Sequence, residues 1–95
     1  MIELAQPYRL SSRCRFRVVG DEGVVVRLDG AEVVALNGIG AAMLELMRDG
    51  TRTLGDVAAC IVERFDVDKL VAEQDASEFA RELEEAGIVE KAGSP

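Results

Sequence analysis

The first third of the chain alternates apolar and polar residues in three short runs. Between Cys14 and Val19 the apolar side chains alternate with arginines, and a period of two with one apolar face predicts a half-buried strand. Runs at 23–28 and at 32–36 predict two more strands. Glycine and acidic residues at 20–23 predict the first hairpin loop, and Asp29-Gly30 predicts a two-residue turn. In the second strand, Val24, Val26 and Leu28 are expected to share one face. In the third strand, Val34 and Leu36 are expected to share one face.

From residue 38 onward the apolar spacing lengthens to three and four residues, which predicts amphipathic helices. Asn37 is the expected cap of the first helix, and Asp49-Gly50 ends it. Thr53-Leu54-Gly55-Asp56 resembles a capping box that opens the second helix. Asp66-Val67-Asp68 breaks the pattern and offers the cap of a third helix, from about Lys69 to Ala86. The three expected apolar stripes are Ile39, Ala42, Met43 and Leu46; Leu54, Val57, Ala58, Ile61, Val62 and Phe65; and Ala72, Ala76, Phe79, Leu83 and Ala86.

Three strands followed by three helices predict an α+β domain with its helices packed on one face of an antiparallel sheet. The second and third helices have the form of a helix-turn-helix. Residues 13–90 are expected to form this single domain, with 1–12 as an N-terminal lead-in and 91–95 as a disordered tail. Ile88-Val89 is expected to lie back on the fold.

Composition argues against catalysis. Among its 95 residues the chain has no histidine, the commonest general base and metal ligand at neutral pH. Cys14 and Cys60 match no zinc or redox spacing, so we expect no catalytic residue, no metal and no cofactor. The chain shows no signal peptide and no membrane span, and unpaired cysteines suit a reducing compartment, so a cytoplasmic location is expected.

The net charge of −7 comes entirely from the C-terminal half. Residues 1–48 hold six basic and six acidic side chains, whereas residues 49–95 hold five basic and twelve acidic ones. An acidic half disfavours binding to phosphate backbones and suits a partner with basic groups, although an acidic helix face also simply aids solubility.

The chain resembles the PqqD family, the recognition elements that bind precursor peptides in pathways for ribosomally made, post-translationally modified peptides. The matching features run in order from residue 20 to residue 89. They are Val24-Val25-Val26 before an Asp-Gly turn, Val34-Ala35-Leu36-Asn37, Gly40, Asp49-Gly50-Thr51 with Thr53-Leu54, Phe65-Asp66-Val67, Asp75, Phe79-Ala80, Leu83 and Gly87-Ile88-Val89. The chain departs from the usual pattern in having Val33-Val34 where an aromatic residue is common, and in its arginine-rich first strand.

The resemblance implies a winged helix-turn-helix that binds the leader region of a precursor peptide. The leader adds as a strand to the exposed sheet edge, packs against the third helix and is presented to a separate modifying enzyme, which is a radical SAM protein in the PqqD case. The expected binding residues lie on the third strand and the third helix. They are Glu32, Val33, Val34, Ala35, Leu36, Val71, Asp75, Glu78, Phe79 and Glu82.

These site assignments have plainer alternatives. Asp75, Glu78 and Glu82 also fit an ordinary solvated helix face, and Phe79 fits a core position. Arg13, Arg15 and Arg17 share one strand face, and either contact a partner enzyme or an acidic leader, or face solvent or the chain's own acidic helices.

Two other functions, and the oligomeric state, remain open from the sequence. A winged helix-turn-helix is also typical of DNA-binding regulators, but the acidic third helix opposes contact with phosphates. A chaperone for some other client would have the same features. The exposed edge could also pair with a second copy, so both a monomer and a homodimer are expected states.

Overall fold

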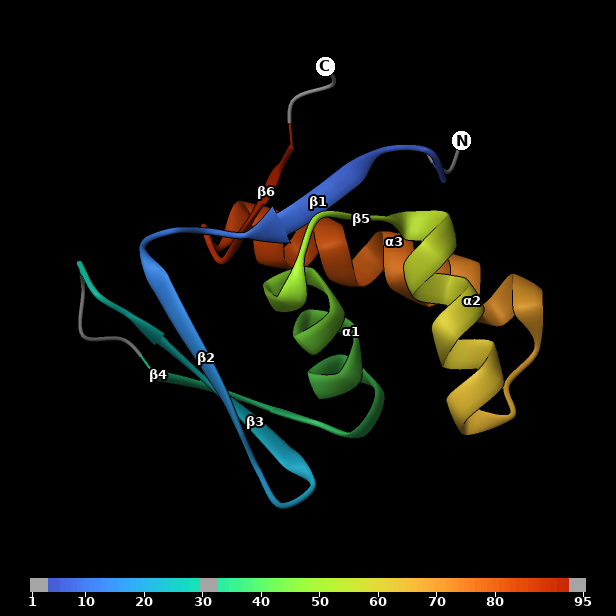
Figure 1. Cartoon of the computed structure of the whole chain (residues 1–95), viewed down its shortest axis with the longest axis horizontal. Helices are drawn as coiled ribbons and strands as arrows, with labels where there is room; N and C mark the ends of the chain where they lie inside the picture. Colours follow the sequence, from blue (N-terminus) through green and yellow to red (C-terminus); the bar gives the residue numbers. More distant parts are fainter. Residues whose placement is uncertain (1–3, 30–32, 93–95) are drawn as a thin grey trace.

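The computed structural model describes residues 4–29 and 33–92, with Asn37 described by its main chain only. Figure 1 shows a twisted sheet on one side of the molecule and three helices on the other. The elements, in chain order, are β1 Pro7–Leu10, β2 Cys14–Val19, β3 Glu22–Arg27, β4 Val33–Asn37, α1 Gly38–Asp49, β5 Arg52–Thr53, α2 Leu54–Phe65, α3 Lys69–Glu85 and β6 Val89–Lys91.

The main sheet is an antiparallel meander in the order β2-β3-β4, as the sequence predicts. Val19 pairs with Glu22, so the first turn contains only Gly20 and Asp21, and Gly20 supplies the positive φ of 63° that this turn needs. Val26 pairs with Val33, and the midpoint of this register falls between Asp29 and Gly30. Residues 30–32 themselves lie outside the described residues. Glu22 and Gly23 belong to β3 rather than to the hairpin loop.

One face of this sheet covers the core. Cys14, Phe16 and Val25 are buried on it, and the partly buried Val34 and Leu36 pack against the same core. Within the run of three valines the central one is therefore the core residue. The shared face of Val24, Val26 and Leu28 is the one that points away from the helices.

Helix α1 lies between the sheet and the other two helices (Figure 1), which explains its wide buried surface. Its expected stripe is only partly correct: Ala42 and Met43 are buried, whereas Ile39 and Leu46 are half-buried. Three further residues are buried because α1 is covered from more than one direction, namely Ala41, Leu44 and Met47. The expected cap of α1 depends on the Asn37 side chain, which the structure does not describe.

Helices α2 and α3 begin at the residues that the sequence indicates. The Thr53 side chain accepts a hydrogen bond from the main-chain N–H of Asp56 at 3.1 Å. The Asp68 carboxylate accepts one from the N–H of Leu70, also at 3.1 Å. Such caps satisfy N–H groups that have no partner within the helix, and each contributes about 1 kcal/mol. At the other end of α3, Arg27 of the sheet donates to the carbonyl oxygen of Ala86 at 2.8 Å.

A second small sheet, in the order β5-β1-β6, joins both ends of the domain. The N-terminal segment expected as a lead-in supplies its central strand, β1. Two residues of the expected tail are ordered parts of the domain, because Lys91 ends β6 and Ala92 donates from its N–H to the carbonyl oxygen of Pro7 at 3.0 Å. Residues 93–95 lie outside the described residues.

Tyr8 of β1 offers a spectroscopic test of this small sheet. Its side chain is buried, and burial, with a smaller contribution from Glu84, raises the pKa of its phenol above the ordinary value near 10. A raised pKa favours the protonated folded form, so this stabilisation is present at lower pH and is lost as the pH rises through the folded-state pKa. Because Tyr8 is the single tyrosine and there is no tryptophan, phenolate absorbance reports it alone.

We expect the absorbance midpoint of the folded chain to lie above pH 10, and the midpoint in denaturant to lie near 10. Glu84→Gln should lower the folded midpoint without abolishing the shift, since burial is the larger cause. Equal midpoints in folded and denatured protein would show that Tyr8 is not held in this position.

Candidate functional site

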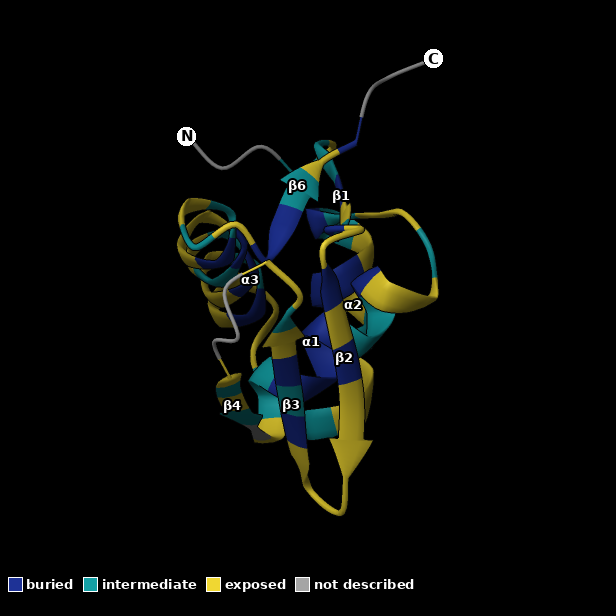
Figure 2. Cartoon of the chain, turned by 90° about the vertical axis from the view of Figure 1, so that its left-hand side faces the viewer, coloured by how far each residue is buried: buried dark blue, intermediate teal, exposed yellow. Residues whose placement is uncertain are grey.

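The main sheet has two free edges, β2 and β4, and each faces a different helix (Figure 2). On the β4 side, Leu36 of the strand and Phe79 of α3 line one hollow. On the β2 side, Val18 of the strand and Phe65 of α2 line another. An unpaired strand edge can template a further strand, so both edges are candidate docking positions for an extended peptide.

Arginine side chains cap the β2 edge. Arg48 of α1 donates from Nη1 to the carbonyl oxygen of Phe16 at 3.2 Å, and its guanidinium lies 5.5 Å from the centre of the Phe16 ring. Arg15 donates to the carbonyl oxygen of Cys14 at 3.1 Å. Two acceptors that an incoming strand would need are therefore already bonded within the chain.

The direction of the Phe16 carbonyl also fixes the pattern at the opposite edge. It points away from β3, so the facing pair of Phe16 and Val25 is a non-hydrogen-bonded pair of the ladder. Hydrogen-bonded and non-hydrogen-bonded pairs alternate in antiparallel sheets. Val25 therefore directs its main-chain groups toward Val34 of β4, and the neighbours of Val34, which are Val33 and Ala35, direct theirs to the free edge. Among the described residues, neither has a main-chain partner within the chain on that edge.

A hollow of about 350 Å³ lies beside this free edge. Ala35 and Leu36 come from β4, Gly40 from the first turn of α1, and Phe79 from the middle of α3. A Cβ atom at position 40 would lie 3.2 Å from Cε1 of Phe79, so Gly40 is what allows the ring to lie against α1. Glu22 adds the charged side chain to an otherwise apolar lining.

The structure brings part of the expected site together. Ala35, Leu36 and Phe79 line one hollow, and Val33 lies next to it on the same strand with 63% of its surface exposed. Val34 points toward the core and is half-buried. Glu32 lies outside the described residues. The remaining expected residues are exposed on α3 and do not line the hollow, namely Val71, Asp75, Glu78 and Glu82.

Two lining residues were not expected as site residues. Gly40 belongs to the family pattern quoted above, and a glycine in the first turn of an apolar helix was the available signal. Glu22 was assigned to a hairpin loop, and only the register of β3 with β4 places it opposite Asn37, at the end of the hollow.

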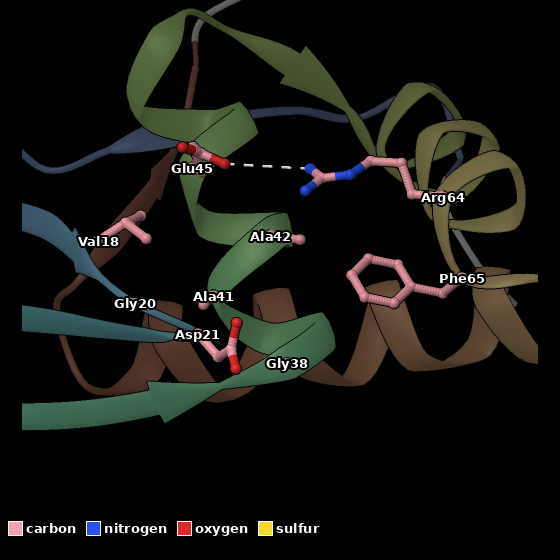
Figure 3. A pocket seen from close by; sticks show the side chains of 9 residues that line it. All are labelled: Val18, Gly20, Asp21, Gly38, Ala41, Ala42, Glu45, Arg64 and Phe65. Carbon is pink, nitrogen blue, oxygen red and sulfur yellow. Dashed lines mark ion pairs between the residues drawn. The ribbon is translucent and has the colours of Figure 1, made fainter.

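The hollow on the β2 side is larger, about 440 Å³, and three charged side chains line it, those of Asp21, Glu45 and Arg64 (Figure 3). Arg64 of α2 reaches across it toward Glu45 of α1, with 4.0 Å between the two charged groups. Phe65 and Val18 supply apolar surface, and Asp21 stands at the hairpin end. Along the adjoining β2 edge the Cys14 and Phe16 carbonyl oxygens are already bonded to arginines, so a strand added beside this hollow would find fewer acceptors than one added at β4.

Burial raises the pKa of the Cys14 thiol, which keeps it protonated and unreactive at neutral pH. Its Sγ lies 3.8 Å from the carbonyl oxygen of Gly87, a contact typical of a packed thiol. Within residues 4–29 and 33–92, no cluster of three or more potential metal ligands occurs. A search of the same residues finds no helix long and apolar enough to cross a membrane.

The chain is a small α+β domain with an open strand edge that faces a helix, an arrangement that peptide-recognition modules use. The chain belongs to the PqqD family, described as coenzyme PQQ synthesis protein D, whose sequence profile matches residues 22–89. None of the curated proteins matches the chain.

Solved structures share this fold. The chain is similar to TbiB1 in complex with the TbiA(beta) leader peptide, with 21% identity, a TM-score of 0.80, and coverage of 90% of this chain and 99% of that one. It is also similar to a lasso peptide synthetase B1 complexed with its leader peptide, with 23% identity, a TM-score of 0.75, and coverage of 87% and 96%.

A third similar structure is the PqqD truncation of PqqCD from Methylobacterium extorquens, described as a functional, stand-alone recognition element. It shows 21% identity, a TM-score of 0.76, and coverage of 95% of both chains. These likenesses confirm the expected fold.

Proposed function

We propose that this chain binds the leader region of a ribosomally synthesised precursor peptide and presents it to a separate modifying enzyme. The carrying observation is the open β4 edge beside the hollow of Leu36 and Phe79, on a sheet whose other edge is capped by Arg15 and Arg48. Membership of the PqqD family, and two structural neighbours that hold leader peptides, support the proposal.

In the proposed binding mode the leader adds as a fourth strand beside β4. Its main chain pairs with the edge-directed groups of Val33 and Ala35, which supplies affinity that depends little on leader sequence. One leader side chain enters the hollow lined by Leu36 and Phe79, and a large apolar side chain suits that lining. The chain contributes no catalytic group, so modification takes place on the enzyme.

The proposed context follows from the same features. The receiving enzyme is a radical SAM protein or another enzyme of such a pathway, and assembly takes place in the cytoplasm. A leader on the β4 edge occupies the surface through which two copies would pair, so the leader-bound chain is proposed to be a monomer. The exposed carboxylates of α3 oppose the alternative of DNA binding.

The acidic flank of α3 gives a first test. Asp75 is exposed one helical turn before Phe79, and we propose that it meets basic groups of the leader. Asp75→Lys is expected to weaken leader binding about three- to fivefold at low salt, which corresponds to less than about 1 kcal/mol, as for other exposed charge pairs. The probe is a synthetic peptide spanning the leader of the precursor encoded beside the gene for this chain, titrated by calorimetry.

The matched control is Glu63→Lys, which makes the same charge change at an exposed position of α2. It should leave leader affinity unchanged, and added salt should remove the effect at position 75. Equal affinities for wild type and Asp75→Lys at low salt would rule out this electrostatic contribution. No binding of the leader to the wild-type chain would reject the proposed function itself.

A further inference from the structure

The face of the main sheet that points away from the helices exposes an unusual amount of apolar surface. We call it the outer face, and it comprises Arg13, Arg15, Arg17, Val19, Glu22, Val24, Val26, Leu28, Val33 and Ala35. Figure 2 views the molecule from this side, with the sheet in front of the helices. Of the seven large apolar side chains exposed within the described residues, four belong to this face: Val19, Val26, Leu28 and Val33, with exposed fractions of 60%, 36%, 58% and 63%.

The apolar part of the outer face is also hollowed. Val19, Val24 and Val26 line a depression of about 480 Å³ together with Arg15 and Arg17. Contiguous apolar surface with a polar border is typical of a protein-protein contact, whereas apolar residues exposed singly need no explanation.

The arginines on this face are not neutralised by the chain's own acidic helices, which lie on the opposite side of the sheet (Figure 1). Arg17 has no ion pair within the described part of the chain. Within the described ranges, Arg15 donates only to the main-chain carbonyl oxygens of Ser12 and Cys14. Arg13 approaches Asp29, but at 3.9 Å and with 78% of its side chain exposed. Among the described residues of the outer face, three arginines stand against the single carboxylate of Glu22, so this face is positive in a chain whose net charge is −7.

We propose that the outer face is the docking surface for the modifying enzyme, which contacts it through an apolar centre bordered by carboxylates. This inference rests on the proposed function. Exposed valines supply area to bury, and guanidinium groups bind carboxylates with directional hydrogen bonds. A leader strand added beside β4 would lie next to Val33, at the border of this face, so docking here brings the enzyme to the bound peptide.

Other occupants fit less well. Two copies of the chain pairing through this face in a symmetric dimer would bring two rows of arginines together, and like charges repel. An anionic membrane would attract the arginines but would repel a chain whose net charge is −7.

The test measures enzyme affinity and leader affinity on the same variants. The probe is the modifying enzyme encoded beside the gene for this chain, purified and titrated with and without the synthetic leader. Arg17→Glu combined with Val26→Thr reverses one charge and removes apolar surface while keeping a β-branched residue in the strand. Two controls are matched: Arg17→Lys keeps the charge, and Arg52→Glu makes the same reversal at an exposed position of β5.

We expect the double variant to bind the enzyme at least about tenfold more weakly, and both controls to stay within about twofold of wild type. Leader affinity should be unchanged in all variants. Equal enzyme affinity for the double variant and wild type would overturn the inference, as would absence of enzyme binding to wild type at about 100 µM. If the wild-type chain did not bind the leader, the proposed function would be rejected instead. The titration of the enzyme without leader would still decide whether the outer face is its docking surface.

A membrane arm completes the test. Vesicles of phosphatidylcholine with phosphatidylglycerol are sedimented with wild type and with the double variant. Binding of wild type that the double variant loses would assign the face to a lipid surface and overturn the assignment to an enzyme. We expect no binding of either form.

Discussion

Ala35→Pro is expected to reduce affinity for the leader peptide at least about tenfold while the domain stays folded. Proline has no N–H, and its ring occupies the place of the hydrogen that Ala35 directs to the free edge of β4. The substitution therefore removes one donor and also prevents close approach of a paired strand. Proline is tolerated at edge positions whose N–H faces solvent, so the β3-β4 ladder should survive.

Two comparisons make this result specific. Ala35→Ser keeps the N–H and a small side chain, and should bind the leader within about threefold of wild type. Val34→Pro removes a donor that pairs with Val25 inside the sheet, and should instead lower the thermal unfolding midpoint sharply. Calorimetric titration gives the affinities and circular dichroism gives the unfolding midpoints. A folded Ala35→Pro variant that binds like wild type would exclude strand addition at β4.

Gly23→Ala is expected to give a large loss of stability. A Cβ atom at position 23 would clash with the Phe16 ring and would lie 3.1 Å from Cβ of Ala41, so the added methyl group is confined from two directions. Phe16 is buried, and Arg48 lies over its ring, which leaves it little room to move. Overpacking of this kind costs about 1–3 kcal/mol.

The matched control is Gly50→Ala. Position 50 has no positive φ, and an added Cβ would meet no atom within 4 Å. Alanine there should be neutral or stabilising by less than about 1 kcal/mol, because it reduces the freedom of the unfolded chain. Urea unfolding measures both free energies. If Gly23→Ala proved as stable as Gly50→Ala, the packing of Phe16 against β3 would be wrong.

Periodicity predicted the elements that carry their own apolar face. The strands β2, β3 and β4 alternate in sequence, and α2 and α3 begin directly after Thr53 and Asp68, whose side chains form local caps. Local patterns of this kind survive folding because the same residues make the contacts. The run Val24-Val25-Val26 shows the limit, since three consecutive valines do not reveal which one faces the core.

Elements that depend on distant partners were not predicted. β1 pairs with β5 and β6, strands of two and three residues that begin more than forty positions later in the chain and show no alternation. The capping of the β2 edge was not predicted for the same reason. It depends on a distant partner, because Arg48 reaches Phe16 across 32 positions. The sequence therefore identified β4 as a free edge, while only the structure distinguishes it from the other edge of the sheet.

The central claim is that the leader pairs with the β4 edge beside α3, and amide chemical-shift mapping with isotope-labelled chain and unlabelled leader tests it most directly. The account predicts the largest shifts at Val33, Ala35 and Leu36 and along α3 around Phe79, with slowed hydrogen exchange at the Val33 and Ala35 amides. Shifts confined to β2 and to the hollow between Val18 and Phe65 would contradict it.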